Sequence, residues 1–246
     1  MPILHVVIPF YNERATLGPC LERVVAAPLP ADWGRALALV NDCSKDGSGD
    51  VASQLVKGLT ARGVAAALLH HPVNRGKGAA LQTGFDHVLT VAAPDDLIII
   101  QDADLEYDPN DYAALLAPLI AGEAAVVFGT RWGRHARTDG LWRKVHAMGN
   151  RVLTGFSNLL TGHRVSDMEC CYKVFTVSAL RTIRPRLTEE RFGIEPQIAA
   201  AVARHRLKLV ERPVTYAPRE VAEGKKIRAR DGFRAFWVMV RERFRR

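Results

Sequence analysis

Short apolar runs alternate with longer amphipathic runs along most of the chain. The apolar runs have the length of strands, and in the segments between them apolar residues recur three or four positions apart, as on one face of a helix. We predict strands at 3–9, 36–40, 64–70, 97–101, 124–129, 169–176 and 207–216, and helices at 13–27, 51–62, 78–91, 109–121, 141–160 and 193–204. Near-continuous apolar strands that alternate with helices predict an α/β fold, in which helices cover both faces of a mostly parallel sheet.

The end of the chain has a different pattern. Its large apolar side chains form one stripe at helical spacing, made of Phe233, Phe236, Trp237, Val240 and Phe244. Residues 225–246 hold nine Lys or Arg and two acidic residues, so they carry +7 of the net charge of +8. We therefore divide the chain into a domain at 1–224 and a basic amphipathic segment at 225–246. Either the stripe packs on the domain with the arginines in solvent, or it lies on an anionic membrane surface.

Composition excludes several classes of protein. With 48% hydrophobic and 24% charged residues, a chain of 246 residues can bury a large core and is not disordered. No apolar run approaches the ~18 residues of a membrane span, and residues 1–10 lack the pattern of a signal peptide. Four cysteines without CxxC spacing favour the reducing cytoplasm. Because the body is nearly neutral, we expect no nucleic-acid partner.

The sharpest chemical signal is Asp102-Ala103-Asp104, directly after a buried strand. Ligands of parallel sheets bind at the carboxyl ends of the strands. Two carboxylates in one tight turn can hold Mg²⁺ or Mn²⁺, with Glu106 as a third ligand, and such a cation neutralises a diphosphate leaving group. The alternative is a solvated turn without a ligand.

Two further polar loops follow predicted strands. In residues 41–48, Asp42 can accept hydrogen bonds from a nucleobase or a ribose, although the loop also suits a plain turn and helix cap. In residues 74–80, free backbone N–H groups and Lys77 at the start of a helix suit a phosphate or a carboxylate. The alternative for that loop is that its glycines allow close backbone packing.

The order and spacing of these motifs resemble glycosyltransferase family 2. The resemblance rests on residues 8–13, 40–48, 74–80, 101–104 and 129–131, while residues 166–175, 192–196 and 223–227 are similar to the subgroup that contains the dolichyl-phosphate mannose synthases. It implies a GT-A fold, a nucleotide-sugar donor and a divalent metal. Asn41 stands where the family more often has Asp, which leaves the nucleobase open. Cys43 and Cys171 stand where the family often has Gly.

The resemblance also implies roles for single residues. The nucleoside would be held by Pro9, Tyr11, Glu13 and Asp42, the metal and diphosphate by Asp102 and Asp104, and phosphate groups by Arg131, Arg219 and Lys226. Lys77 and Ala103 complete the expected donor site. The expected catalytic residues are Asp104, Arg131 and Glu195.

The expected reaction moves a hexose, with inversion, from a GDP- or UDP-sugar to a polyprenyl phosphate at the inner face of a membrane. A lipid phosphate is already anionic, so the protein supplies positioning and electrostatics and no base. One alternative is a saccharide hydroxyl acceptor, which requires a general base from Asp167, Glu169 or Glu195. A second alternative is a non-catalytic module that binds a sugar nucleotide, against which the intact Asp-x-Asp argues.

Overall fold

One seven-stranded sheet forms the centre of the computed structural model, which describes residues 1–132, 141–219 and 229–245. Its strands are β1 (Ile3–Phe10), β2 (Gly34–Asn41), β3 (Ala65–His70), β4 (Leu97–Ile100), β5 (Val126–Thr130), β6 (Lys173–Thr176) and β7 (Leu209–Pro213), in the order β3-β2-β1-β4-β6-β5-β7. Strand β6 runs antiparallel to β4 and β5, and the other neighbours are parallel. This confirms the predicted α/β fold with a mostly parallel sheet.

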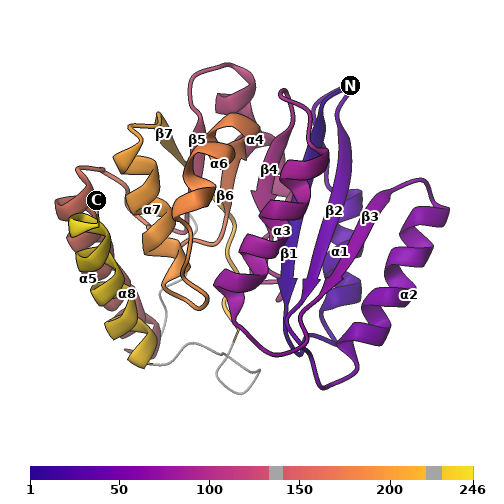
Figure 1. Cartoon of the computed structure of the whole chain (residues 1–246), viewed down its shortest axis with the longest axis horizontal. Helices are drawn as coiled ribbons and strands as arrows, with labels where there is room; N and C mark the ends of the chain where they lie inside the picture. Colours follow the sequence, from indigo (N-terminus) through magenta and orange to yellow (C-terminus); the bar gives the residue numbers. More distant parts are fainter. Residues whose placement is uncertain (133–140, 220–228, 246) are drawn as a thin grey trace.

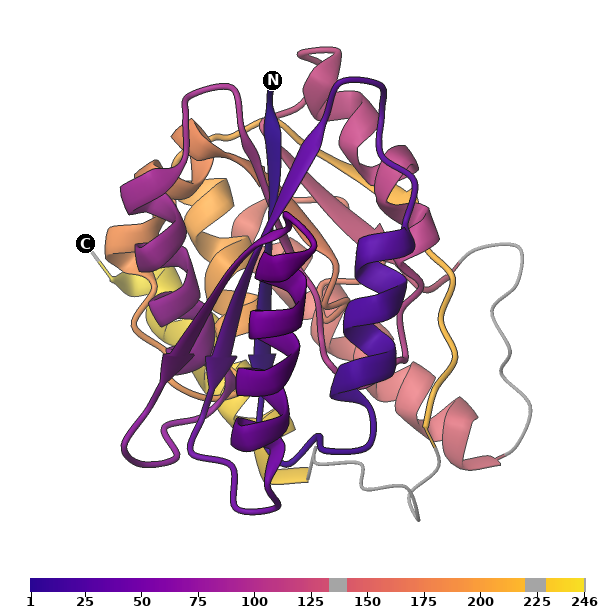
Figure 2. The same ribbon diagram turned by 90° about the vertical axis from the view of Figure 1, so that its right-hand side faces the viewer.

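Helices cover both faces of the sheet. They are α1 (Leu17–Ala26), α2 (Ser48–Ala61), α3 (Lys77–Val91), α4 (Tyr112–Ile120), α5 (Leu141–Thr161), α6 (Val177–Ile183), α7 (Ile194–Arg204) and α8 (Ala229–Phe244), with short 3₁₀ turns at Pro109–Asp111 and Arg184–Arg186. Helices α1, α2 and α4 lie on one face, and α3, α6 and α7 lie on the other (Figures 1 and 2). Helices α5 and α8 lie side by side at the flank nearest β7 (Figure 1). Because helices cover both faces of the sheet, β4, with the sequence LIII, is buried at every position.

Some differences from the predicted elements have local reasons. Helix α1 begins at Leu17 and not at 13, because the carbonyl of Glu13 accepts from the N–H groups of Thr16 and Leu17 in a preceding turn. Strand β6 begins at Lys173 and not at 169, because the Lys173 ammonium donates to the carbonyls of Met168 and Cys170 and curls that segment. Helix α6 was not predicted, since its seven residues are too few for a periodic signal.

Helix α8 packs on the domain with a face other than the aromatic stripe. Ala235, Val238 and Met239 are buried, whereas Phe233 and Phe244 are 81% and 79% exposed. The alternative in which the stripe packs on the domain is wrong, because its aromatic side chains reach solvent. Arg241 pairs with the buried carboxylate of Glu189 at 2.7 Å, and Arg234 reaches the same carboxylate at 2.9 Å with 46% of its side chain exposed. Among the helices of the described residues, we find none with the length and hydropathy of a membrane span.

The parallel strands bring their carboxyl ends to one edge of the sheet. The segments that follow β1, β2, β3, β4, β5 and β7 lie there, together with the residues that precede the antiparallel strand β6 (Figures 1 and 2). The polar motifs at 41–48, 74–80 and 101–104 follow these strand ends, so the fold itself gathers them. Glu195 comes from the first turn of α7.

Candidate active site at the carboxyl ends of the strands

The turn after β4 presents two carboxylates and buries the residue between them. Ala103 packs in the core, while the side chains of Asp102 and Asp104 are 20% and 24% exposed. Leu105 adopts φ 65°, which turns the chain sharply so that the Glu106 N–H donates to Asp104 Oδ1 at 3.1 Å. A hard cation needs only one or two protein carboxylates when phosphates supply further oxygens. Asp102 and Asp104 therefore fit a Mg²⁺ or Mn²⁺ ion, and Ala103 offers only its backbone.

Glu106, expected as a third metal ligand, points to other partners. Its Oε1 accepts from the backbone N–H of Arg219 at 3.0 Å, and its Oε2 accepts from the Tyr216 hydroxyl at 2.8 Å. Within the described ranges, no three Asp, Glu, His or Cys side chains converge as a metal cluster. Glu106 instead fastens the segment after β7 to the Asp-x-Asp turn.

Arg219 joins three strand ends. Its Nη2 lies 3.0 Å from Glu13 Oε2, and its Nε donates to the backbone carbonyl of Asp104 at 2.7 Å. Two expected donor residues far apart in the sequence, Glu13 and Arg219, are thus brought together beside the Asp-x-Asp turn. Tyr11 follows β1 directly, whereas Pro9 is buried within that strand opposite Val40.

The loops after β1 and β2 are tied together by side chains. Ser44 and Ser48 accept from the backbone N–H groups of Asn12 and Glu13 at 3.0 and 2.8 Å. Asp46 accepts from the N–H of Arg14 at 3.1 Å and from Ser48, and although its burial acts the other way, these hydrogen bonds lower the pKa of Asp46. The structure therefore shows the turn role of this loop, whereas the expected helix cap is absent, because Gly47 precedes α2 and offers no side chain.

Asp42 is the anion that the glycine-rich loop binds. Its carboxylate accepts from the N–H groups of Arg75 and Gly76 at 2.8 and 2.7 Å, and His71 Nδ1 lies 2.7 Å away. The other ring nitrogen of His71 meets Thr83 at 2.9 Å. Asp42 thus organises the loop, and a nucleoside would have to use its remaining acceptor capacity. No ligand spacing marks His71 in the sequence, so the sequence does not predict its supporting role.

The glycines of the same loop allow a close backbone approach. A Cβ at Gly78 would lie 2.1 Å from the carbonyl of Glu189, and the N–H of Ala79 donates to the carbonyl of Glu190 at 2.9 Å. Gly76 has φ 103°, a conformation that favours glycine. The close-packing alternative is therefore correct for the glycines, and the prediction that the N–H groups of Arg75, Gly76 and Ala79 are free for a ligand is wrong.

Unlike these backbone N–H groups, the side chain of Lys77 in the same loop faces the Asp-x-Asp turn. Its ammonium lies 2.9 Å from Asp102 Oδ2 and 3.3 Å from Glu195 Oε1. Burial alone would lower the pKa of Lys77, but the neighbouring carboxylate of Asp102, with that of Glu195, holds it well above the usual value. On its other side Glu195 pairs with the fully buried Lys173. Glu195 therefore lies between two ammonium groups. Lys173 belongs to the motif at 166–175, but that motif does not by itself predict this ion pair.

Arg131, at the end of β5, is held by one carboxylate. Its Nε and Nη2 donate to the two oxygens of Asp167 at 2.7 and 2.8 Å, and its backbone N–H donates to Asp167 Oδ2 at 3.0 Å. The guanidinium also stacks over the ring of Tyr216, 5.2 Å from its centre. A phosphate would meet the remaining N–H groups of Arg131.

Glu169 differs from the other two candidate bases. Its Oε1 is shut off from solvent and has no hydrogen-bond partner among the described residues. Burial, with the nearby Glu195 carboxylate, raises the pKa of Glu169 to about 7. Asp167 is committed to Arg131, and Glu195 Oε1, which also accepts no hydrogen bond, lies 3.3 Å from the Lys77 ammonium. Among the described residues, Glu169 Oε1 has neither a hydrogen bond nor an ion pair.

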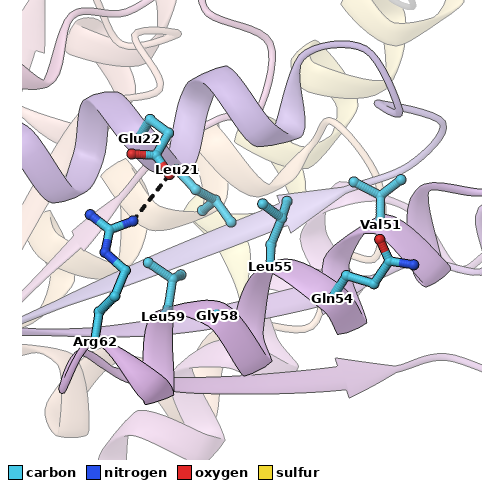
Figure 3. Close-up of a pocket in the computed structure, with 8 residues that line it drawn as sticks. All are labelled: Leu21, Glu22, Val51, Gln54, Leu55, Gly58, Leu59 and Arg62. Carbon is cyan, nitrogen blue, oxygen red and sulfur yellow. Dashed lines mark hydrogen bonds and ion pairs between the residues drawn. The ribbon is translucent and has the colours of Figure 1, made fainter.

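Lys226, expected to contact phosphate, is outside the described residues. Figure 3 shows a surface cavity between α1 and α2, lined by Leu21, Leu55 and Leu59 and by the pair of Glu22 and Arg62 at 3.2 Å. It lies on the flank of the sheet and holds none of the candidate catalytic groups.

Comparison with known proteins gives a family match over most of the chain. The model of glycosyl transferase family 2 matches residues 5–184. An undecaprenyl-phosphate 4-deoxy-4-formamido-L-arabinose transferase of Edwardsiella ictaluri is 31% identical over 222 residues, which are 90% of this chain and 62% of the relative. A dodecaprenyl-phosphate galacturonate synthase of Rhizobium johnstonii is 31% identical, over 88% of this chain and 60% of the relative. The chain thus spans about three fifths of the length of these curated relatives.

Solved structures share the fold at lower sequence identity. The glucosyl-3-phosphoglycerate synthase of Mycobacterium tuberculosis, solved with Mn²⁺, UDP-glucose and phosphoglyceric acid, superposes with a TM-score of 0.65 at 17% identity. The match covers 98% of this chain and 79% of that enzyme. At this identity the likeness supports the fold, which agrees with the expected GT-A architecture.

Proposed function

The chain belongs to glycosyl transferase family 2, and on that premise we propose that it transfers a hexose from a nucleotide sugar to a polyprenyl phosphate. The observation that carries the proposal is the meeting of Asp102 and Asp104 with Lys77 and Arg219 at the carboxyl edge of the sheet. Relatives named as transferases to undecaprenyl or dodecaprenyl phosphate support the acceptor class.

The donor is held mainly through its diphosphate. Asp102 and Asp104 would hold Mg²⁺ or Mn²⁺, which would neutralise charge on the diphosphate and make it a better leaving group. Lys77 and Arg219 add positive charge beside Asp102 and Asp104. Glu13 and Asp42, with Pro9 and Tyr11 nearby, form the nucleoside end of the site.

The acceptor phosphate attacks the anomeric carbon of the donor sugar. A bond forms between that carbon and an oxygen of the acceptor phosphate, while the bond to the diphosphate oxygen breaks and its electron pair leaves with the diphosphate. Attack opposite the leaving group inverts the anomeric carbon. The acceptor oxygen carries negative charge at neutral pH, so Arg131 is needed to orient the phosphate and no residue is needed to take a proton.

We further propose that the exposed apolar face of α5 and α8 rests on an anionic membrane surface. Apolar side chains that reach solvent on these two helices are Met148, Val152, Leu159, Phe233, Phe236, Trp237 and Phe244. Phe156 of α5 stacks on Phe236 of α8 at 4.4 Å between ring centres, which makes the two helices one surface. Exposed Arg151 and Arg243 lie on the same helices, and each such charge contributes about 1 kcal/mol near an anionic leaflet.

A saccharide hydroxyl acceptor is the second candidate, and Glu169 is the observation that favours it. Its uncommitted Oε1 and its pKa of about 7 suit a general base at neutral pH. In that reaction Glu169 takes the proton of the attacking hydroxyl, a role that the ion-paired Glu195 is poorly arranged to fill.

Thermal denaturation in the presence of candidate donors tests the donor assignment. Because a ligand that binds only the folded state raises the melting temperature, the matching nucleotide sugar among GDP-mannose, UDP-glucose and related donors raises it with Mn²⁺. A chelator removes the shift. If no nucleotide sugar shifts the melting temperature at millimolar concentration with Mn²⁺, the proposed donor class is wrong.

A further inference from the structure

The ammonium of Lys77 lies next to Asp102, where we expect the divalent cation to bind. The ammonium lies 2.9 Å from Asp102 Oδ2, donates a hydrogen bond to it, and is 17% exposed. This contact occupies one of the two carboxylate oxygens of Asp102 and puts a positive charge beside the other, so an incoming metal meets competition for one oxygen and repulsion from the ammonium.

A second carboxylate, that of Glu195, lies close to the same ammonium. Glu195 Oε1 lies 3.3 Å from Lys77 Nζ and accepts no hydrogen bond from any described residue. The other Glu195 oxygen is paired with Lys173, which is fixed by the carbonyls of Met168 and Cys170. Lys77 can therefore move away from Asp102 and keep Glu195 as its partner, whereas Lys173 is held by three partners.

We propose that Lys77 is a resident counter-ion of Asp102 that is exchanged for the divalent cation when the donor diphosphate binds. Before the donor arrives, Lys77 neutralises Asp102 and opposes binding of the metal alone. When metal and diphosphate arrive together, Lys77 leaves Asp102, and its charge serves the diphosphate and Glu195. The proposal rests on the proposed function for the diphosphate, but the exchange at Asp102 does not require that function.

Charge balance makes the exchange favourable only with the donor present. Without a nucleotide, a divalent cation at Asp102 adds two positive charges beside the Lys77 ammonium. A cation that binds together with a diphosphate adds almost no net charge. Metal and nucleotide should thus bind with positive coupling, and by linkage each strengthens the other by the same factor. Removal of the Lys77 ammonium should weaken this coupling, because the metal alone should bind more tightly and the nucleotide more weakly.

The test is Mn²⁺ binding to the protein without nucleotide, measured by electron paramagnetic resonance of free Mn²⁺. We expect Lys77→Met to bind Mn²⁺ alone at least about tenfold more tightly than the native protein, the scale of one charge-assisted hydrogen bond. The same variant should bind the nucleoside diphosphate at saturating Mn²⁺ at least about tenfold more weakly. Lys57→Met, which removes an exposed lysine of α2, controls for the change in net charge, and Lys77→Arg should keep weak binding of Mn²⁺ alone.

The two opposite shifts separate an exchange from a merely structural role. Unchanged or weaker binding of Mn²⁺ by Lys77→Met overturns the proposal, and so does tighter binding by the Lys57→Met control. If Lys77→Met does not fold, the native protein still decides, because absence of coupling between Mn²⁺ and nucleotide also overturns it. If the native protein binds no nucleotide at all, the proposed function fails, while the comparison with Mn²⁺ alone still tests the exchange.

Discussion

The guanidinium of Arg131 and the carboxylate of Asp167 form a two-bond fork, with distances of 2.7 and 2.8 Å. The pair joins the end of β5 to the segment before β6, and Asp167 is fully buried. Asn150 of α5 donates to the same carboxylate at 3.0 Å. Three elements at the acceptor side of the candidate site thus depend on one side chain.

Asp167→Asn should destabilise the protein by roughly 3–5 kcal/mol, because it leaves the largely buried Arg131 without its counter-charge. Urea unfolding followed by circular dichroism measures the loss. Asp95→Asn, which changes an exposed carboxylate at the amino end of β4, is the matched control and should change stability by less than about 0.5 kcal/mol. Equal stability of the Asp167→Asn variant and the native protein would show that the fork is unimportant for folding.

The stability of the protein should depend on the charge of Glu169. The pKa of Glu169 is raised from 4.5 to about 7 in the folded state, so the folded protein holds a proton that the unfolded chain loses. Its contribution therefore becomes unfavourable as pH rises from about 4.5 to 7, by up to about 3 kcal/mol. Glu169→Gln should gain stability relative to the native protein as pH rises through this window. A stability difference that stays constant between pH 5 and pH 8 contradicts the raised pKa.

The aromatic stripe of α8 should bind membranes without holding the domain together. Phe233→Glu with Phe244→Glu should weaken flotation with vesicles that contain anionic lipid, because both side chains reach solvent. The melting temperature should hardly change. Val238→Glu, on the buried face of the same helix, should lower it strongly. Undiminished vesicle binding by the double variant would leave the membrane proposal without support.

The sequence predicts the fold well because its signals are local. Buried runs such as that of Leu97–Ile100 need no knowledge of their neighbours, and the rule on strand ends then gathers Asp102, Asp104 and the other motifs at one edge. Only β6 escapes the parallel pattern, because strand direction depends on the course of the chain between strands and not on the strand residues.

The sequence does not predict the ion pairs of the site, because they join residues distant along the chain. Glu106 is close to Asp104 in sequence, yet its carboxylate belongs to Arg219 and Tyr216. The glycines at 76 and 78 look like a cradle for a ligand, yet they admit the backbone of residues 189–190. The sequence also does not predict which face of α8 is buried, because Ala235, Val238 and Met239 pack on the domain in place of the aromatic stripe, and the partner of Arg241, Glu189, is far away in the sequence.

Transfer of a hexose from its nucleotide donor to polyprenyl phosphate tests the central claim most directly. With Mn²⁺, the native protein should form the polyprenyl-phosphate sugar, and a chelator should stop the reaction. Asp104→Asn should lower the rate at least about 10²-fold while keeping its melting temperature, because it removes a carboxylate that holds the ion on the diphosphate. Asp95→Asn, at the other end of β4, should stay fully active. An Asp104→Asn variant as fast as the native protein would contradict the account.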